Sequence, residues 1–255
     1  MKKILTILFF LLASTVSAHT FTANGDAQID TAQSQFGGAS GLFDGTGDYL
    51  SAPDHADWIL GSGDWTFSFW VRQPAIDGTN ESVVGQWASG SYGWIIQIDS
   101  TAITFVATTN CDLGTIFSLG PAVTIGTDAW IHVVAVRDGN TFRTFINGAA
   151  GGTGDLTGKT LPDCTGTLNI GRNGDASEYY SGWIDEFTFQ KGTARWVTTF
   201  TPPTAEDCGP SLANTKFLLH MNGADTSTTF TDDAATSCGG AAVRRSDPII
   251  IETDD

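Results

Sequence analysis

The stretch from Asp128 to Ala149, DAWIHVVAVRDGNTFRTFINGA, is the part of this sequence that best indicates the fold. It contains two runs of β-branched and aromatic residues, WIHVVAV and TFRTFIN, each bounded by turn residues, as is typical of β-strands. Between them, Val136 to Thr141 includes an Asp-Gly pair, which suits the positive φ angles of a tight hairpin turn. Asn147-Gly148 marks the next turn. The stretch therefore predicts a hairpin of antiparallel strands.

Runs of the same type recur along the chain. In WTFSFWV (65–71), alternate residues share one face of the expected strand, and GWIIQI, AITFVA, TLNIG and GWIDEFTF are similar. A sustained helical stripe of apolar residues is absent from the sequence. Many short strands joined by turns predict an all-β fold, a two-sheet antiparallel β-sandwich of the jelly-roll type.

The composition is that of a folded, acidic protein. The chain has 255 residues, with 12 Lys and Arg against 28 Asp and Glu, and a formal net charge of −16. We do not expect nucleic acid or an anionic membrane surface as a partner, because both attract proteins chiefly through Lys and Arg. Hydrophobic residues make up 41%, too many for a disordered acidic chain.

The N-terminus has the features of an export signal. Two lysines precede an apolar run (4–13), and Val16 and Ala18 are suited to a signal-peptidase site. The run is shorter than the ~20 residues of a membrane span. We expect residues 1–18 to be a cleavable signal peptide and the mature chain to be secreted or periplasmic, without membrane insertion. The alternative is an N-terminal helix of the mature fold.

The four cysteines have a different meaning in an exported chain, because export leads to an oxidising compartment where disulfides form. Their spacing contains no C-x-x-C pair, which argues against a zinc cluster. Of the three connectivities, we favour Cys111–Cys164 and Cys208–Cys238. Four free thiols are the alternative.

The C-terminal part differs from the body. A Pro-Pro pair at 202–203 ends the strand-rich region, so we expect one body over 19–205 and a linker over 206–215. A C-terminal piece with one apolar strand (216–238) and an acidic tail (239–255) follow.

Four stretches, taken in order, resemble a known family. They are FGGASGLFDGTGDYLSAPD (36–54), WTFSFWVR (65–72), the stretch 128–149 and GWIDEFTFQKGTARWVTTFTPPTA (182–205). Together they are similar to the laminin-G-like jelly rolls of the concanavalin A-like lectin/glucanase superfamily. The resemblance implies two antiparallel sheets packed face to face, and a binding or adhesion module more often than an enzyme.

The order of the motifs departs from that family. Its members usually begin with the piece that here reads KFLLHMNGADTSTTFTDDAA and comes last, at 216–235. One interpretation is a circular permutation, in which Lys216–Met221 folds back to pair beside the strand Gly182–Phe189. The other is the truncated start of a second repeat. We favour the permuted closure, since a lone apolar strand would leave an exposed edge.

The sequence gives little support for catalysis. Glucanases of the superfamily carry an E-x-D-x-x-E arrangement, which this sequence lacks. Asp185 and Glu186 are adjacent, so on a regular strand they would point to opposite faces. The histidines, His19, His55, His132 and His220, belong to no catalytic motif, and we expect His132 to be packed or hydrogen-bonded within a strand.

The resemblance also implies a Ca²⁺ site near a sheet edge, built from carboxylates and carbonyl oxygens. The candidate ligands are Asp44, Asp48, Asp185, Asn222 and Asp225. The alternative is that Asp44 and Asp48 only form turn hydrogen bonds and that backbone amides cap Asp185.

Sugar binding requires aromatic rings that are accessible at the surface. The candidates lie near Gly, Ser and Asn-rich turns: Trp58, Trp87, Tyr92, Trp94, Tyr179 and Tyr180. Such residues can instead cover the core. The sequence thus predicts a secreted, non-catalytic module that binds a glycan or another extracellular surface. The alternatives are an adhesion module contacting proteins and a glycoside hydrolase-like enzyme.

Overall fold

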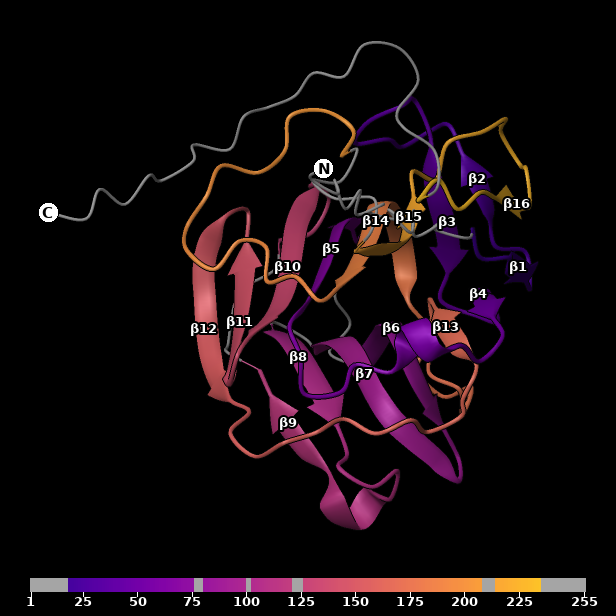
Figure 1. Cartoon of the computed structure of the whole chain (residues 1–255). Coiled ribbons are helices and arrows are strands. Elements are labelled where there is room, and N and C mark those ends of the chain that lie inside the picture. The colour runs from indigo at the N-terminus through magenta and orange to yellow at the C-terminus, as the bar shows by residue number, and fades with distance from the viewer. Residues whose placement is uncertain (1–17, 76–79, 100–101, 121–125, 208–213, 235–255) are drawn as a thin grey trace, which may run out of the picture.

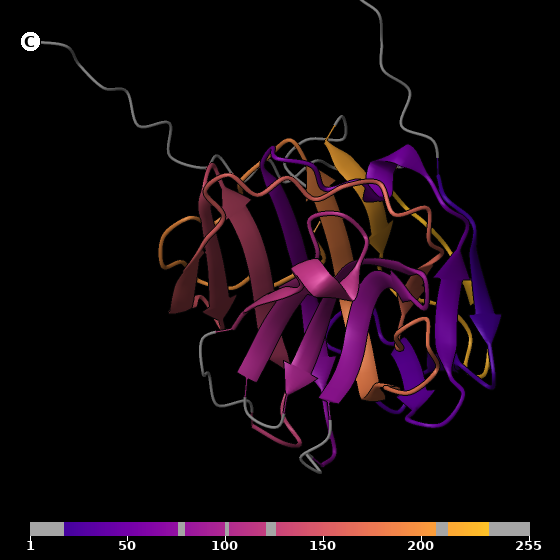
Figure 2. The same ribbon diagram turned by 90° about the horizontal axis from the view of Figure 1, so that it is seen from below.

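The computed structural model describes residues 18–75, 80–99, 102–120, 126–207 and 214–234. Two β-sheets pack face to face (Figure 1), and Figure 2 shows the long strands of one sheet in front of those of the other. The described strands pair in antiparallel fashion throughout. The predicted all-β sandwich is confirmed.

The first sheet has eight strands. In spatial order they are β16 (Thr229–Phe230), β1 (Phe21–Asn24), β4 (Tyr49–Ala52), β13 (Leu168–Ile170), β6 (Asn80–Ala88), β7 (Ser91–Asp99), β8 (Ala102–Ala107) and β9 (Phe117–Leu119).

The second sheet is built around β14. In spatial order its strands are β12 (Ala149–Asp155), β11 (Thr141–Ile146), β10 (Ile131–Asp138), β5 (Trp65–Arg72), β14 (Ser181–Lys191), β3 (Ser40–Asp44) and β2 (Gln28–Asp30), and β15 (Thr215–Leu219) also pairs with β14. Two short 3₁₀ helices, η1 (Ala56–Trp58) and η2 (Leu113–Thr115), lie in the connections.

The hairpin predicted from the opening stretch is β10–β11. Asp138 pairs with Thr141, and Gly139 between them has a φ of 58°, which a glycine adopts at little cost. The next turn, at Asn147 and Gly148, also has positive φ angles, of 49° and 76°. The first turn is formed by Gly139 and Asn140, with Asp138 as the last residue of β10, whereas Asn147 and Gly148 form the second turn as the sequence predicts.

Aromatic side chains fill the space between the sheets. The Phe67 ring stacks on Phe189 of the neighbouring strand, with centroids 4.3 Å apart, and contacts Trp94 of the opposite sheet at 5.0 Å. Trp65 reaches across to Phe105 at 5.2 Å. These rings are buried and form one continuous core, as expected for two packed inner faces.

The outer face of the second sheet is covered as well. Trp196 and Phe200 come from the segment after β14 and pack against Val134, Val136 and Phe145. The whole of β5 except its last residue is also buried, including the polar residues opposite its apolar face.

The C-terminal segment completes the sandwich. β15 pairs with β14 through Phe187↔Leu219 and Phe189↔Phe217, which is the neighbour predicted for this strand. β3 pairs with the first half of β14, so β3 and β15 share the edge of β14 that β5 leaves open. β16 extends the other sheet next to β1. The segment contributes strands to both sheets of one sandwich, as expected of a permuted domain.

One predicted disulfide is confirmed. Cys111 and Cys164 are bonded across a sequence separation of 53 residues. The predicted pair Cys208–Cys238 lies outside the described residues, as do residues 1–17 and the acidic tail. Within the described ranges, no helix is long and apolar enough to cross a membrane.

Candidate functional site

Three of the six aromatic residues predicted to contact sugar are in the core. Trp58 and Tyr180 have 0% of their surface exposed and Trp94 has 1%. Trp94 Nε1 donates a hydrogen bond to the carbonyl oxygen of Trp58 (3.0 Å), and Tyr180 Oη donates to the carbonyl oxygen of Trp183 (3.2 Å). Their polar atoms are satisfied inside the protein, so the prediction that these three rings bind sugar is wrong.

The other three candidates are half-buried and lie in two places. Trp87 and Tyr92 face each other across the β6–β7 hairpin, with ring centroids 5.2 Å apart. Tyr179 lies in the connection before β14, where it forms an isolated β-bridge with Arg172. The guanidinium of Arg172 lies 3.4 Å from the centre of the Tyr49 ring.

Tyr179 lines a cavity of about 320 Å³, which we call the Tyr179 pocket. Its lining residues are Asp44, Gly45, Asn80, Glu81, Ser177, Glu178, Tyr179 and Ser181. They come from the end of β3, the start of β6 and the segment leading into β14. The structure thus places a predicted metal ligand, Asp44, and a predicted sugar contact, Tyr179, in the same pocket.

Two acids of the pocket are held by protein donors. Glu81 is buried, and its Oε2 accepts hydrogen bonds from Gln73 Nε2 (2.9 Å) and from the backbone N–H of Ser181 (2.8 Å). Glu178 Oε2 accepts from Ser82 Oγ at 3.0 Å and also from Gln97 Nε2. These bonds fix the orientation of both carboxylates before any ligand arrives.

The sequence did not single out Glu81, Glu178 or Asn80. They belong to no motif, and they meet only because β6 and the segment before β14 lie side by side. Of the three, Glu178 could have been considered from the sequence, because it directly precedes Tyr179, a predicted sugar contact, and lies among polar residues.

A cluster of three carboxylates shares Asp44 with the pocket. Asp26, Asp44 and Asp48 each place an oxygen within 4.8 Å of the others. Asp48 accepts the backbone N–H of Asp26 at Oδ1 (2.7 Å) and that of Asp44 at Oδ2 (3.0 Å). Burial raises the pKa of Asp48 to about 6. The turn hydrogen bonds expected as the alternative are therefore present, within an oxygen-rich cluster that suits a hard cation.

The other predicted calcium ligands have partners of their own. Asp185 is buried; its Oδ2 accepts from the backbone N–H groups of Gln35 (2.8 Å) and Phe36 (3.1 Å), and burial raises its pKa to about 7. The amide caps expected as the alternative for Asp185 are therefore present. Asn222 donates to Glu206 (2.8 Å), and Asp225 accepts the backbone N–H of Thr31 (3.1 Å).

Among the described His, Cys, Asp and Glu residues, two groups of three have converging ligand atoms: Asp26–Asp44–Asp48 and His19–His55–Asp57. Of the predicted calcium ligands, Asp44 and Asp48 are the ones in such a group.

Asp185 and Glu186 do not follow the regular alternation that we expected. Glu186 has a φ of 51° at a β-bulge in β14, and both side chains are buried. Glu186 Oε1 lies 2.8 Å from His220 Nδ1, and its Oε2 accepts the backbone N–H of Asp207 (2.9 Å). Both carboxylates thus bond to other parts of the protein.

His132 is buried and hydrogen-bonded, as predicted. Its Nε2 lies 2.9 Å from Ser68 Oγ, and burial lowers its pKa to about 3, so the ring is neutral. Trp70, Trp196 and Phe200 surround it.

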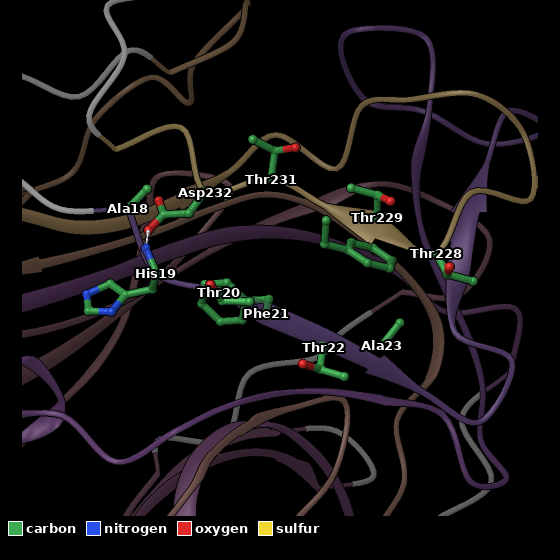
Figure 3. Close-up of a pocket in the computed structure, with 11 residues that line it drawn as sticks. Ala18, His19, Thr20, Phe21, Thr22, Ala23, Thr228, Thr229, Thr231 and Asp232 are labelled. Carbon is green, nitrogen blue, oxygen red and sulfur yellow. Dashed lines mark hydrogen bonds between the residues drawn. The ribbon is translucent and has the colours of Figure 1, made fainter.

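A second cavity, of about 490 Å³, lies along β1 and β16. Figure 3 shows the residues that line it, 18–23 and 228–232, five of them threonines. Phe21 and Phe230 are nearly buried, so the groove offers hydroxyl groups rather than an accessible aromatic ring. Asp232 Oδ2 accepts the backbone N–H of His19 (2.7 Å) at one end.

Comparison with known proteins gives a family and a set of similar folds. A laminin G family model, described as the concanavalin A-like lectin/glucanases superfamily, matches residues 44–195. No curated protein matches the sequence.

Among solved structures, the binding domain of Paraclostridial Mosquitocidal Protein 1 is similar, with a TM-score of 0.57 and 15% identity over 69% of this chain and 45% of that one. The receptor binding domain of botulinum neurotoxin C/D mosaic serotype has a TM-score of 0.54 and 15% identity over 72% of this chain and 45% of that one. This chain therefore spans less than half the length of these structures, and the likeness concerns the fold.

Proposed function

The chain belongs to the concanavalin A-like lectin/glucanases superfamily, and on that premise we propose that it is a non-catalytic module that binds a glycan in the Tyr179 pocket. We further propose that it acts outside the cell, after removal of residues 1–18.

The composition of the Tyr179 pocket is the observation that carries the proposal. A sugar ring presents apolar C–H faces and hydroxyl edges, so it is bound by an aromatic ring together with carboxylate and amide groups. Tyr179 is the aromatic residue of the lining, and Asp44, Asn80 and Glu178 are polar residues of the lining. At about 320 Å³ the pocket is at the small end of ligand sites, which favours a short saccharide or the end of a longer one.

Similar proteins support a binding role. Solved structures of similar fold include the binding domain of Paraclostridial Mosquitocidal Protein 1 and the binding domains of botulinum neurotoxins. An identity of 14–15% is too low to infer the ligand of this chain from these structures, but a binding role agrees with the presence of the pocket.

The carboxylates argue for binding rather than hydrolysis. Glycosidases need one carboxyl group as proton donor and another as nucleophile or base. Glu81 and Glu178 instead each accept two hydrogen bonds from protein donors through one oxygen. Asp185 and Glu186 are buried.

A bound Ca²⁺ would fit the cluster Asp26–Asp44–Asp48, because all three ligands are hard oxygens. Calcium there would screen the like charges of the carboxylates and favour the ionised form of Asp48. Since Asp44 also lines the pocket, the ion would stabilise the wall nearest the sugar.

The position of His19 supports export. The backbone nitrogen of His19 lies 2.7 Å from a carboxylate oxygen of the buried Asp232. Cleavage after Ala18 would turn this nitrogen into an ammonium group, and the hydrogen bond would become an ion pair.

A glycan array with the purified protein tests the proposal. We expect specific binding in wild type and loss of at least about tenfold in affinity in Tyr179→Ala, which corresponds to about 1.4 kcal/mol. Trp87→Ala is the matched control, since it removes a half-buried aromatic ring outside the pocket, and should bind like wild type. The reverse result for the two variants would contradict the assignment to the pocket.

A protein-binding adhesion module is the second candidate. Leu113 (46% exposed), the first residue of η2, and Ile116 (49%), which directly follows η2, are exposed apolar side chains close in sequence to the disulfide at Cys111. This function would be favoured if no glycan on the array binds, and if a protein partner binds the wild type but not the double variant Leu113→Ser, Ile116→Ser.

A further inference from the structure

A second cluster of metal-ligating side chains lies outside the Tyr179 pocket. His55 and Asp57 belong to the η1 turn that follows β4, and His19 lies two residues before the start of β1. His19 Nε2 lies 3.1 Å from Asp57 Oδ2, and His55 Nδ1 lies 3.2 Å from the same oxygen. The two imidazole rings are 4.7 Å apart, centre to centre.

These separations match those of a metal site. In a tetrahedral zinc site with bonds of about 2.0–2.2 Å, neighbouring donor atoms lie about 3.3 Å apart. Two imidazole nitrogens and one carboxylate oxygen are donors that suit Zn²⁺ and related transition metals, whereas Ca²⁺ prefers oxygen ligands only.

His55 Nδ1 lies close to two atoms of Asp57. It is 3.1 Å from the backbone nitrogen, whose N–H it accepts, and 3.2 Å from the carboxylate oxygen Oδ2. Because this nitrogen has a single lone pair, binding a metal would replace the hydrogen bond from the backbone N–H of Asp57, and the ion would then lie between Nδ1 and Oδ2.

The surrounding residues hold the donors in place and leave one side open. The His19 ring packs against the buried Trp58 at 4.5 Å, and its backbone nitrogen bonds to Asp232 (Figure 3). Lys216 Nζ lies 3.4 Å from Asp57 Oδ1, the carboxylate oxygen that does not face the imidazoles. The exposed fractions of the side chains, 12% for His19, 25% for Asp57 and 52% for His55, show that an ion can enter from solvent.

From this geometry we propose that His19, His55 and Asp57 form a zinc site with a fourth position open to solvent. The site joins the segment before β1 to the connection after β4. It is separate from the proposed calcium cluster, because Asp48 immediately precedes β4 and His55 lies beyond the end of that strand.

Titration calorimetry of the full chain with zinc chloride tests the proposal. We expect one Zn²⁺ per wild-type chain. His55→Asn and Asp57→Asn should each weaken binding at least about tenfold. His55→Asn is suitable because asparagine is also a good N-cap residue and preserves the start of η1.

Asp54→Asn is the matched control, because it removes a neighbouring carboxylate outside the cluster and keeps an acceptor for Gln86. It should bind zinc like wild type. In NMR spectra, zinc should shift the ring signals of His19 and His55 and leave those of His132 and His220 unchanged. Absence of binding by wild type, or wild-type affinity in His55→Asn, would overturn the proposal.

Discussion

Tyr179 and Tyr180 are neighbours in the sequence and belong to different regions of the molecule. Tyr179 lines an open pocket beside acids and amides, whereas Tyr180 is fully buried with Trp94 and Phe43 in the core between the sheets. Both residues lie in the connection before β14, where Tyr179 bridges to Arg172 while Tyr180 packs into the core and its Oη donates to the carbonyl oxygen of Trp183. The core region should therefore determine stability, and the pocket region should determine binding.

The largest expected effect is on stability, after substitution of a residue in the core. Trp94→Ala removes a ring that contacts Phe67 at 5.0 Å and the donor to the Trp58 carbonyl, so it should lower the free energy of unfolding by about 3–5 kcal/mol. Urea denaturation measures this change. Glycan affinity of the fraction that remains folded should stay at the wild-type value, and a selective loss of affinity would break the division between the two regions.

An intermediate effect concerns buried carboxyl groups. Burial raises the pKa of Asp185 to about 7 and that of Asp48 to about 6, above the ordinary value of 3.8. Folding therefore favours their protonated forms. Their contribution to stability is fully present below pH 4 and is lost as the pH rises towards 7, at no more than about 1.4 kcal/mol per pH unit for each group.

Urea denaturation between pH 4 and 7 checks this dependence. Added Ca²⁺ should reduce the part of this pH dependence that comes from Asp48, because a bound cation favours the ionised carboxylate. A flat profile would show that neither carboxyl group is shifted as described.

The smallest expected effect distinguishes the neighbouring tyrosines. Tyr180→Phe removes the hydroxyl that donates to the Trp183 carbonyl and should cost about 1 kcal/mol of unfolding free energy. Tyr179→Phe makes the same chemical change on a half-buried ring and should cost only a few tenths, about 0.3 kcal/mol. Equal costs in thermal denaturation would contradict the assignment of the two rings to different regions.

The strands could be predicted from sequence because their signals are local. The alternation in β5 and the turn between β10 and β11 depend on residues a few positions apart, and both are present in the structure. The pairing of β15 with β14 was predictable from the family resemblance, since KFLLHM matches a strand that normally comes first.

The site was harder to predict, because it depends on which surface covers which residue. Trp58 and Trp94 lie near turns, but proximity to a turn does not reveal that both sheets enclose these rings. Glu81 and Glu178 meet through strand packing that no local pattern encodes. The bulge at Glu186, with its positive φ, buries an acid that regular alternation would have placed on the opposite face from Asp185.

An NMR titration of isotopically labelled protein with a glycan selected on the array would test the central claim most directly. The account predicts that the largest shifts occur at Tyr179, Asn80 and Glu178, with little change at Trp87 and Tyr92 across the β6–β7 hairpin. Shifts centred on Trp87 and Tyr92, with the Tyr179 pocket unchanged, would contradict it.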